Sequence, residues 1–138
     1  MDLRPSILDD LGLLAAMEWQ SMEFEKRSGI STEFINLTNN TEVPTRLKTG
    51  LFRIFQESLT NVMRHAQATK VLVRLHEEHN MLVLEITDNG MGISDERKYN
   101  KTSFGILGMK ERAAMIKGHL DVLKLPEGGT KIDLKIPI

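Results

Sequence analysis

ESLTNVMRHA (residues 57–66) ends the most regular amphipathic pattern in this 138-residue chain. The pattern begins at Pro44, whose missing N–H is not needed in the first turn of a helix. From there, apolar side chains recur at steps of three and four residues, which is typical of a helix with one face on a core. They are Leu47, Leu51, Ile54, Phe55, Leu59 and Val62. The sequence therefore predicts a central helix from Pro44 to about Ala66.

A polar stripe runs beside this apolar face. Glu57, Asn61 and His65 are four residues apart, and Arg64 follows Asn61 by three. On an α-helix this spacing places the side chains nearly in one line. The stripe is either a solvated helix face or a surface for phosphate and magnesium, because Asn61 offers a hard oxygen ligand. In the second case Arg64 and His65 would contact phosphate, and Glu57 could orient or deprotonate an attacking group.

Two more helices are predicted around the central one. Residues 6–27 form the first, with Ser6 and Asp9 resembling a capping box and Gly29 as its stop. One mostly apolar face of this helix consists of Leu11, Leu14, Ala15, Glu18 and Met22. Residues 105–117 form the last helix, which is followed by Gly118 and has an inward face made of Ile106, Met109, Ala113 and Ile116.

The remaining regular segments alternate apolar and polar residues, as half-buried strands do. The predicted strands are 30–37, 70–76, 82–86, 119–125 and 130–136. His79-Asn80 suits a hairpin turn between two of them, and residues 94–103 are predicted to be a surface loop. The order of elements predicts one α/β (α+β) domain, a two-layer sandwich of helices on a mixed sheet of about five strands.

Composition excludes several classes of protein. A formal net charge of −1 gives no electrostatic basis for binding nucleic acid or an anionic membrane. The absence of cysteine excludes disulfides, thiolate zinc sites and a cysteine nucleophile, and it fits a reducing, cytoplasmic compartment. No apolar run approaches the roughly 20 residues that a membrane-spanning helix needs.

Two glycine-rich stretches carry further candidate residues. DNGMGI (88–93) places Asp88 directly before Gly90 and Gly92. This is either an ordinary turn or a place where backbone approaches a ligand closely, with a carboxylate that would accept a hydrogen bond from an amine such as that of adenine. SFGILGMKER (103–112) places Gly105 and Gly108 at a helix start, where free N–H groups bind anions.

In this order and spacing, the three stretches resemble the ATP-binding catalytic domain of sensor histidine kinases, in the superfamily shared with gyrase, Hsp90 and MutL. The likeness is closest to kinases of the nitrate/nitrite-sensing and desaturase-regulating type, and it covers nearly the whole chain. It implies a Bergerat-type ATP-binding fold over residues 30–138. Residues 1–29 would then be the end of a dimerisation hairpin and its linker helix.

The resemblance also implies roles for individual residues. Glu57 and Asn61 would be catalytic, with Asn61 as the Mg²⁺ ligand, and residues 94–103 would form a lid. The residues implied to bind ATP are Asn61, Arg64, His65, Asp88, Gly90, Gly92, Ile93, Gly105, Ile106, Leu107, Gly108 and Thr130. Among them, Asp88 would bind the adenine amine, and Thr130 would lie near it through its hydroxyl or a water molecule.

The implied reaction transfers the γ-phosphoryl group of ATP to a histidine on a dimerisation domain, for relay to a response regulator. None of the histidines at 65, 76, 79 and 119 sits in the family's phosphoacceptor setting. We therefore expect a monomeric domain of a homodimeric kinase whose phosphoacceptor lies outside this chain. Two alternatives remain, a serine kinase of the anti-sigma-factor type and a non-catalytic nucleotide-binding module.

Overall fold

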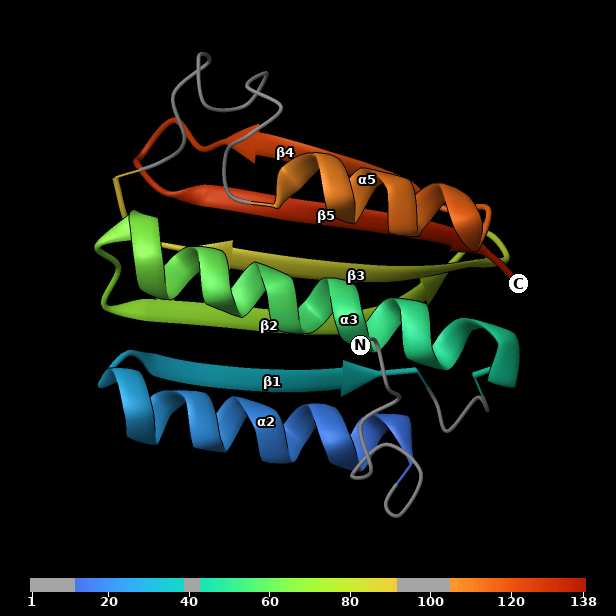
Figure 1. The fold of residues 1–138 in the computed structure, drawn as a ribbon, viewed down its shortest axis with the longest axis horizontal. Coiled ribbons are helices and arrows are strands. Elements are labelled where there is room, and N and C mark those ends of the chain that lie inside the picture. Colours follow the sequence, from blue (N-terminus) through green and yellow to red (C-terminus); the bar gives the residue numbers. More distant parts are fainter. Residues whose placement is uncertain (1–11, 39–42, 92–104) are drawn as a thin grey trace.

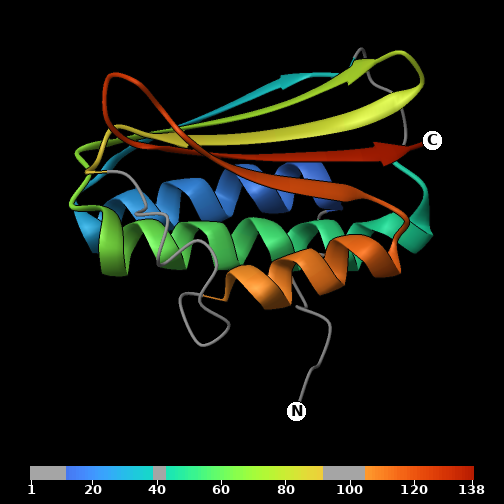
Figure 2. The same cartoon turned by 90° about the horizontal axis from the view of Figure 1, so that it is seen from above.

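The computed structural model describes residues 12–38, 43–91 and 105–138. Its helices are α2 (Leu13–Ser28), α3 (Thr45–Asn61), the π-helix η1 (Val62–Ala66) and α5 (Ile106–Met115). Its strands are β1 (Ser31–Leu37), β2 (Lys70–Glu78), β3 (Met81–Asp88), β4 (His119–Lys124) and β5 (Thr130–Pro137). The helices form one layer and the sheet the other, as Figure 2 shows, which confirms the predicted two-layer α/β sandwich.

The five strands lie in the order β1-β2-β3-β5-β4. β1 pairs with β2 in parallel, and the other neighbours are antiparallel. The parallel pair follows from the chain order, because α3 lies between β1 and β2 and a parallel pair needs such a crossover. The β2–β3 hairpin turns at His79 and Asn80, whose φ angles of 52° and 61° fit the predicted tight turn.

The core lies between the sheet and the helices. The apolar positions predicted for the central helix and for the first hairpin are all buried there. Alternate residues of β2, β3 and β5 point inward because the side-chain period of a strand is two. These inward residues include Val71, Val73, Leu75, Leu82, Leu84, Ile86, Ile132, Leu134 and Ile136.

The mostly apolar face described for the first helix is not the face that α2 buries. α2 buries Leu13, Ala16, Met17, Ser21 and Phe24, whereas Ala15 and Glu18 of the predicted face are exposed and Met22 is 55% exposed. The helix has apolar side chains all round, so periodicity alone does not select a face. The large Phe24 and Met17 side chains decide it, because they bury the most area against the core. Ser6, Asp9 and Leu11 lie outside the described residues.

The opposite face of the sheet carries a charged cluster. Glu85 on β3 accepts a hydrogen bond from Lys131 at 2.6 Å and lies 2.9 Å from His76 Nε2 and 3.3 Å from an Arg74 nitrogen. Burial acts to raise the pKa of Glu85, but the hydrogen bonds and charges of Lys131 and His76 outweigh it and lower the pKa. The cluster therefore favours the charged carboxylate on this face.

The ends of several strands lie together at one end of the sheet, on the left of Figure 1. Asp88 at the end of β3 pairs with Val71 near the start of β2, and Lys124 at the end of β4 pairs with Thr130 at the start of β5. α3 runs toward this end, and α5 begins beside it. This arrangement brings together the three stretches that the sequence analysis selected.

Candidate nucleotide-binding site

Asp88 is one of the few buried charged side chains among the described residues, with 6% of its surface exposed. The N–H of Gly90 donates a hydrogen bond to its Oδ1 at 2.8 Å, and the N–H of Thr130 donates another to the carboxylate. Burial raises the pKa of Asp88, and these two donors partly offset that rise. A carboxylate has about four acceptor positions, so Asp88 can still accept a hydrogen bond from a ligand.

The turn before β5 packs directly on the backbone of Asp88. Gly129 has a φ of 95°, and a Cβ there would overlap the Asp88 carbonyl group. Gly128 has a φ of 102°, and its Cβ would lie 3.4 Å from the Gly90 carbonyl oxygen. The close approach at Gly129 lets the Thr130 N–H reach the carboxylate. The observed contact of Thr130 with Asp88 is through the backbone, and the role of its hydroxyl toward adenine stays a prediction.

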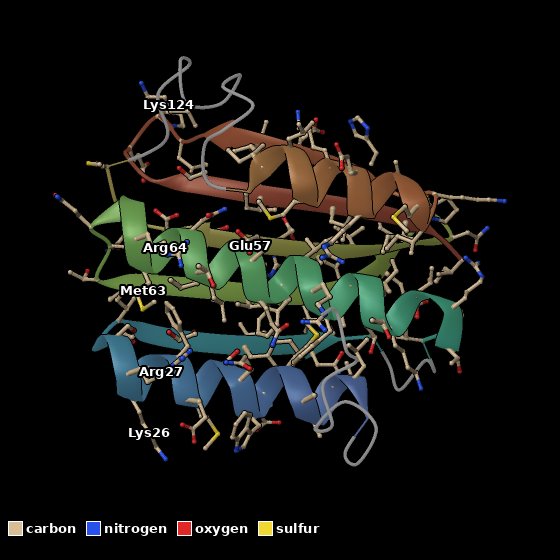
Figure 3. The ribbon with its side chains drawn as sticks, in the orientation of Figure 1. Lys26, Arg27, Glu57, Met63, Arg64 and Lys124 are labelled. Carbon is tan, nitrogen blue, oxygen red and sulfur yellow. The ribbon has the colours of Figure 1, made fainter. Side chains whose placement is uncertain are left out.

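The polar stripe of α3 lies on the side that faces α5. Figure 3 shows Glu57 and Arg64 on this side, with Met63 toward α2. Glu57 and Asn61 are half-buried and Arg64 is exposed. Within the described part of the chain, the Asn61 and Arg64 side chains make no hydrogen bond or ion pair. No other described residue therefore occupies their polar atoms.

The helix geometry changes before His65, the last residue of the predicted polar stripe. After Asn61 the backbone changes from α-helix to the π-helix η1. A π-helix has more residues in each turn, so α-helical spacing does not apply to residues 62–66. Such π segments are frequent at functional sites. The side chain of His65 lies outside what the structure describes.

Gly105 joins the second glycine-rich stretch to the central helix. It precedes α5 with a φ of 68°, and a Cβ there would overlap the Glu57 carboxylate. Gly108 has no atom within 4 Å of its Cβ position, and Leu107 is 42% exposed. Ile106 is buried in the core, so only its backbone can take part in a site. Gly92, Ile93 and the predicted lid lie outside the described residues.

Four elements therefore converge on one site, namely the ends of α3 and β3 and the beginnings of α5 and β5. Asn89, the residue after Asp88, also belongs to this region, although the sequence analysis did not select it. Its side chain binds the start of β2. The signal for it in the sequence is weak, because asparagine before glycine is common in turns.

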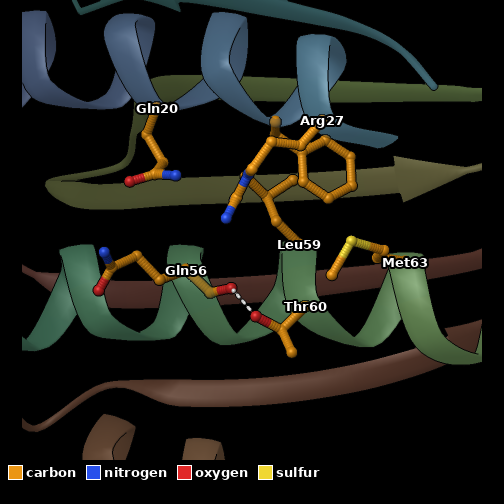
Figure 4. A pocket seen from close by; sticks show the side chains of 7 residues that line it. Gln20, Arg27, Gln56, Leu59, Thr60 and Met63 are labelled. Carbon is orange, nitrogen blue, oxygen red and sulfur yellow. Dashed lines mark hydrogen bonds between the residues drawn. The ribbon is translucent and has the colours of Figure 1, made fainter. Parts of the chain in front are cut away.

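A cleft of about 380 Å³ lies on the opposite side of α3, between α3 and α2. Figure 4 shows it lined by Arg27, Leu59 and Met63, with the Thr60 hydroxyl bonded to the Gln56 carbonyl. None of the predicted site residues lines it. The cleft is therefore separate from the nucleotide site.

The donor chemistry of the site fits magnesium brought by a phosphate ligand. In the described ranges no group of three or more His, Cys, Asp and Glu residues is placed to hold a metal ion. Mg²⁺ is commonly held by only one or two protein oxygens together with substrate phosphates and water. The side-chain amide oxygen of Asn61 is a donor of this kind.

Residues 47–138 match the family model described as "Histidine kinase-, DNA gyrase B-, and HSP90-like ATPase". The chain belongs to this ATPase family. Within the family, it is 39% identical over 137 residues to the signal transduction histidine-protein kinase/phosphatase DegS of Brevibacillus brevis. That alignment covers 99% of the chain but only 35% of DegS, so the chain spans about a third of this relative's length.

Solved structures of histidine kinases share the fold of this ATPase domain. The catalytic domain of ThkA matches with a TM-score of 0.75 and 14% identity, over 91% of the chain and 89% of that domain. The histidine kinase domain of a blue-light activated kinase from Erythrobacter litoralis matches with a TM-score of 0.72 and 19% identity, over 91% of the chain and 60% of that structure. AdeS of Acinetobacter baumannii also scores 0.72 at 14% identity, over 96% of the chain and 72% of AdeS.

These matches confirm the resemblance that the three stretches indicated, a histidine-kinase-type ATP-binding domain. They do not bear on individual site residues, whose roles remain predictions. No helix in the described ranges combines the length and the apolar character needed to cross a membrane.

Proposed function

We propose that this chain binds Mg²⁺-ATP and transfers its γ-phosphoryl group to a histidine on the dimerisation domain of a longer kinase. The observation that carries the proposal is the Asp88 carboxylate, which is buried and accepts hydrogen bonds from the N–H groups of Gly90 and Thr130, at the end of the sheet toward which α3 runs. An acceptor held in this way recognises a donor such as the adenine amine and disfavours guanine, which has a carbonyl oxygen at that place.

The phosphate tail would lie over the end of α3 and the start of α5. Asn61 would hold the magnesium ion, Arg64 would contact phosphate oxygens, and the backbone from Gly105 to Gly108 would offer N–H groups to the anion. The bound ion would neutralise charge on the phosphates. The predicted contact of His65 with phosphate also remains part of the proposal.

In the transfer step, the bond between the γ-phosphorus and the bridging oxygen of ATP breaks as a bond from phosphorus to an imidazole nitrogen forms. ADP leaves, and the imidazole loses its proton. Glu57, on the α5-facing side of α3, would take this proton or orient the imidazole. The chain lowers the barrier mainly by positioning the groups.

The partners in this proposal are the histidine-bearing dimerisation domain and a response regulator that accepts the phosphoryl group. We propose that this domain is monomeric by itself, that its parent kinase is a homodimer, and that the domain works in the cytoplasm. Residues 1–29 are proposed to connect it to the dimerisation hairpin. α2 shares a core with β1 and α3, so any connecting segment would join a folded unit that includes this helix.

Calorimetric titration of residues 1–138 with ATP, ADP and GTP tests nucleotide binding. The expected result is binding of ATP and ADP with little binding of GTP, and Asp88→Asn should remove most of the discrimination between ATP and GTP. An unchanged preference in Asp88→Asn would contradict the assignment of the adenine site.

Phosphotransfer needs its own test. The chain is mixed with radiolabelled ATP and a dimerisation domain that carries the phosphoacceptor histidine. The expected product is a phosphoprotein that is labile in acid and stable in base. An acid-stable phosphoprotein would indicate transfer to serine, and tight ATP binding without any transfer would indicate a non-catalytic module.

A further inference from the structure

Asn89 makes an unusual number of hydrogen bonds for an exposed side chain. Its Oδ1 accepts bonds from the N–H groups of Thr69 and Lys70, both at 2.9 Å. Its Nδ2 donates to the Thr69 hydroxyl oxygen at 2.8 Å, and its backbone N–H donates to the Lys70 carbonyl at 3.3 Å. One residue thus satisfies most of the polar groups at the start of β2.

These bonds connect two parts of the candidate site. Asn89 lies between Asp88 and Gly90, in the turn that presents the buried carboxylate. Thr69 lies shortly after the π-helix η1 and after Gln67, which ends η1 with a φ of 52°. The segment from Arg64 to Thr69 is therefore tied at its far end to the turn that carries Asp88.

The turn is held on two sides at once. Toward β5, the Asp88 carboxylate accepts the Thr130 N–H and its backbone packs on Gly129. Toward β2, the Asn89 amide supplies the contacts. Asp88 therefore makes the contacts toward β5, and Asn89 makes those toward β2.

We propose that Asn89 is a positioning residue of the nucleotide site, whose side-chain amide fixes the distance between the base-binding turn at Asp88 and the phosphate-facing end of η1. This inference rests on the proposed function, since it assigns the base to Asp88 and the phosphates to the region of Arg64. A ligand that binds both parts requires the correct distance between them, whereas the affinity of a ligand that contacts only one part does not depend on that distance.

The test compares ATP with adenosine, which lacks phosphates. Affinities of residues 1–138 for both ligands are measured by calorimetry and by ligand-observed NMR titration. In Asn89→Ala, ATP affinity should fall about tenfold and adenosine affinity by less than about threefold, so the ratio of the two affinities falls. A role in stability alone would lower both affinities together and leave the ratio unchanged.

Variants of Thr69 remove only part of the Asn89 contacts. They also provide a test of the proposal if the Asn89→Ala protein folds poorly. Thr69→Val removes the hydroxyl that accepts from Nδ2 but keeps the backbone N–H, so the ratio should fall about two- to threefold. Thr69→Ser keeps a hydroxyl and should behave like the unmodified chain. A ratio that stays unchanged in Thr69→Val overturns the proposal.

Asn36 provides a matched control. Its Oδ1 also accepts bonds from a backbone N–H and a threonine hydroxyl, both of Thr38. Asn36 lies near the end of β1, whereas the start of β1 pairs with the beginning of β2 that Asn89 binds. Asn36→Ala should leave the affinity ratio unchanged, and an equal fall there would overturn the proposal. If the unmodified chain binds no ATP, the proposed function fails; if it binds ATP and Asn89→Ala keeps the ratio, only this inference fails.

Discussion

The two ends of the candidate nucleotide site are built in opposite ways. At the base end, Asp88, Gly90 and Thr130 are joined by hydrogen bonds, and Gly129 leaves no space against the Asp88 backbone. At the phosphate end, Asn61 and Arg64 make no bond to another described residue, and Gly108 faces open space. The base end is held by bonds within the protein, and the phosphate end offers polar groups that no other described residue binds.

This difference follows from the chemistry of the two parts of a nucleotide. A base is rigid and is read by one or two directional bonds, so a fixed acceptor gives selectivity. Phosphates are charged and bring magnesium and water with them, so the protein needs few fixed contacts there. Substitutions at the base end should therefore affect folding and binding together, and those at the phosphate end should affect binding alone.

The largest effect is expected from Gly129→Ala. The new Cβ would overlap the Asp88 carbonyl, and the residue would keep a φ of 95° that alanine disfavours. We expect a loss of about 2 to 4 kcal/mol in the free energy of unfolding, measured by denaturant titration, together with loss of ATP binding.

Gly128→Ala is the matched control for this prediction. Its φ of 102° imposes similar strain, but its Cβ would lie 3.4 Å from the nearest atom. It should lose clearly less stability than Gly129→Ala. Equal losses in the two variants would show that contact with Asp88 does not matter.

Asn61→Ala should produce the next largest effect, at the phosphate end. ATP affinity in the presence of Mg²⁺ should fall roughly 10- to 100-fold, as expected for a metal ligand, while stability changes by less than about 0.5 kcal/mol. Calorimetry with and without Mg²⁺, and a thermal melt, measure the two quantities. Thr60→Ala, on the side of α3 that lines the cleft, should keep full affinity.

Much of the fold could be predicted from sequence because the central helix and the hairpins have strong periodicity. The burial of Leu51, Phe55 and Ile86 follows from that pattern alone. The inward face of α2 could not be predicted, because apolar residues such as Trp19 and Met22 lie on its exposed side. Tertiary packing, rather than local pattern, decides which stripe is buried.

The candidate site was predicted in outline from its glycines and polar residues. The change to a π-helix at Val62 has no local signal in the sequence, so residue spacing could not predict this backbone geometry. The bonds of Asn89 to Thr69 depend on strand pairing between distant segments, and residue spacing does not show them. Sequence therefore indicates which groups could form the site, whereas the bonds between them follow from the fold.

Glu85→Gln separates stability from binding, since Glu85 lies on the other face of the sheet. We expect a loss of about 1 to 2 kcal/mol in unfolding free energy at pH 7, because the charged bonds to Lys131 and His76 are weakened. ATP affinity should not change. If Glu85→Gln lowered ATP affinity as much as Gly129→Ala does, residues on the far face of the sheet could not be distinguished from those of the nucleotide site.

The loss of unfolding free energy caused by Glu85→Gln should depend on pH. The pKa of Glu85 is lowered in the folded state from its ordinary value of 4.5. A carboxylate whose pKa is lowered by folding stabilises the folded state above its unfolded-state pKa. This stabilisation is lost as the pH falls through the folded-state pKa. The difference between Glu85→Gln and the unmodified chain should therefore shrink below about pH 4.5, as measured by denaturant titration at several pH values.

Arg64→Ala should have the smallest effect. An exposed cation contributes about 0.2 to 1 kcal/mol to an ion pair, so ATP affinity should fall by about two- to fivefold, and added salt should reduce the difference. Adenosine affinity should not change. Arg27→Ala, an exposed arginine on the α2 side of α3, should leave both affinities unchanged.

The contact between Gly105 and Glu57 also limits how this sequence can diverge. A Cβ at position 105 would meet the carboxylate at the end of the Glu57 side chain, so another residue there requires that side chain to turn aside, and the φ of 68° disfavours it as well. A shorter residue at 57 would remove the first obstacle but not the second. In a library that randomises both positions and selects for folded protein, glycine should dominate at 105, most strongly among the clones that keep glutamate at 57.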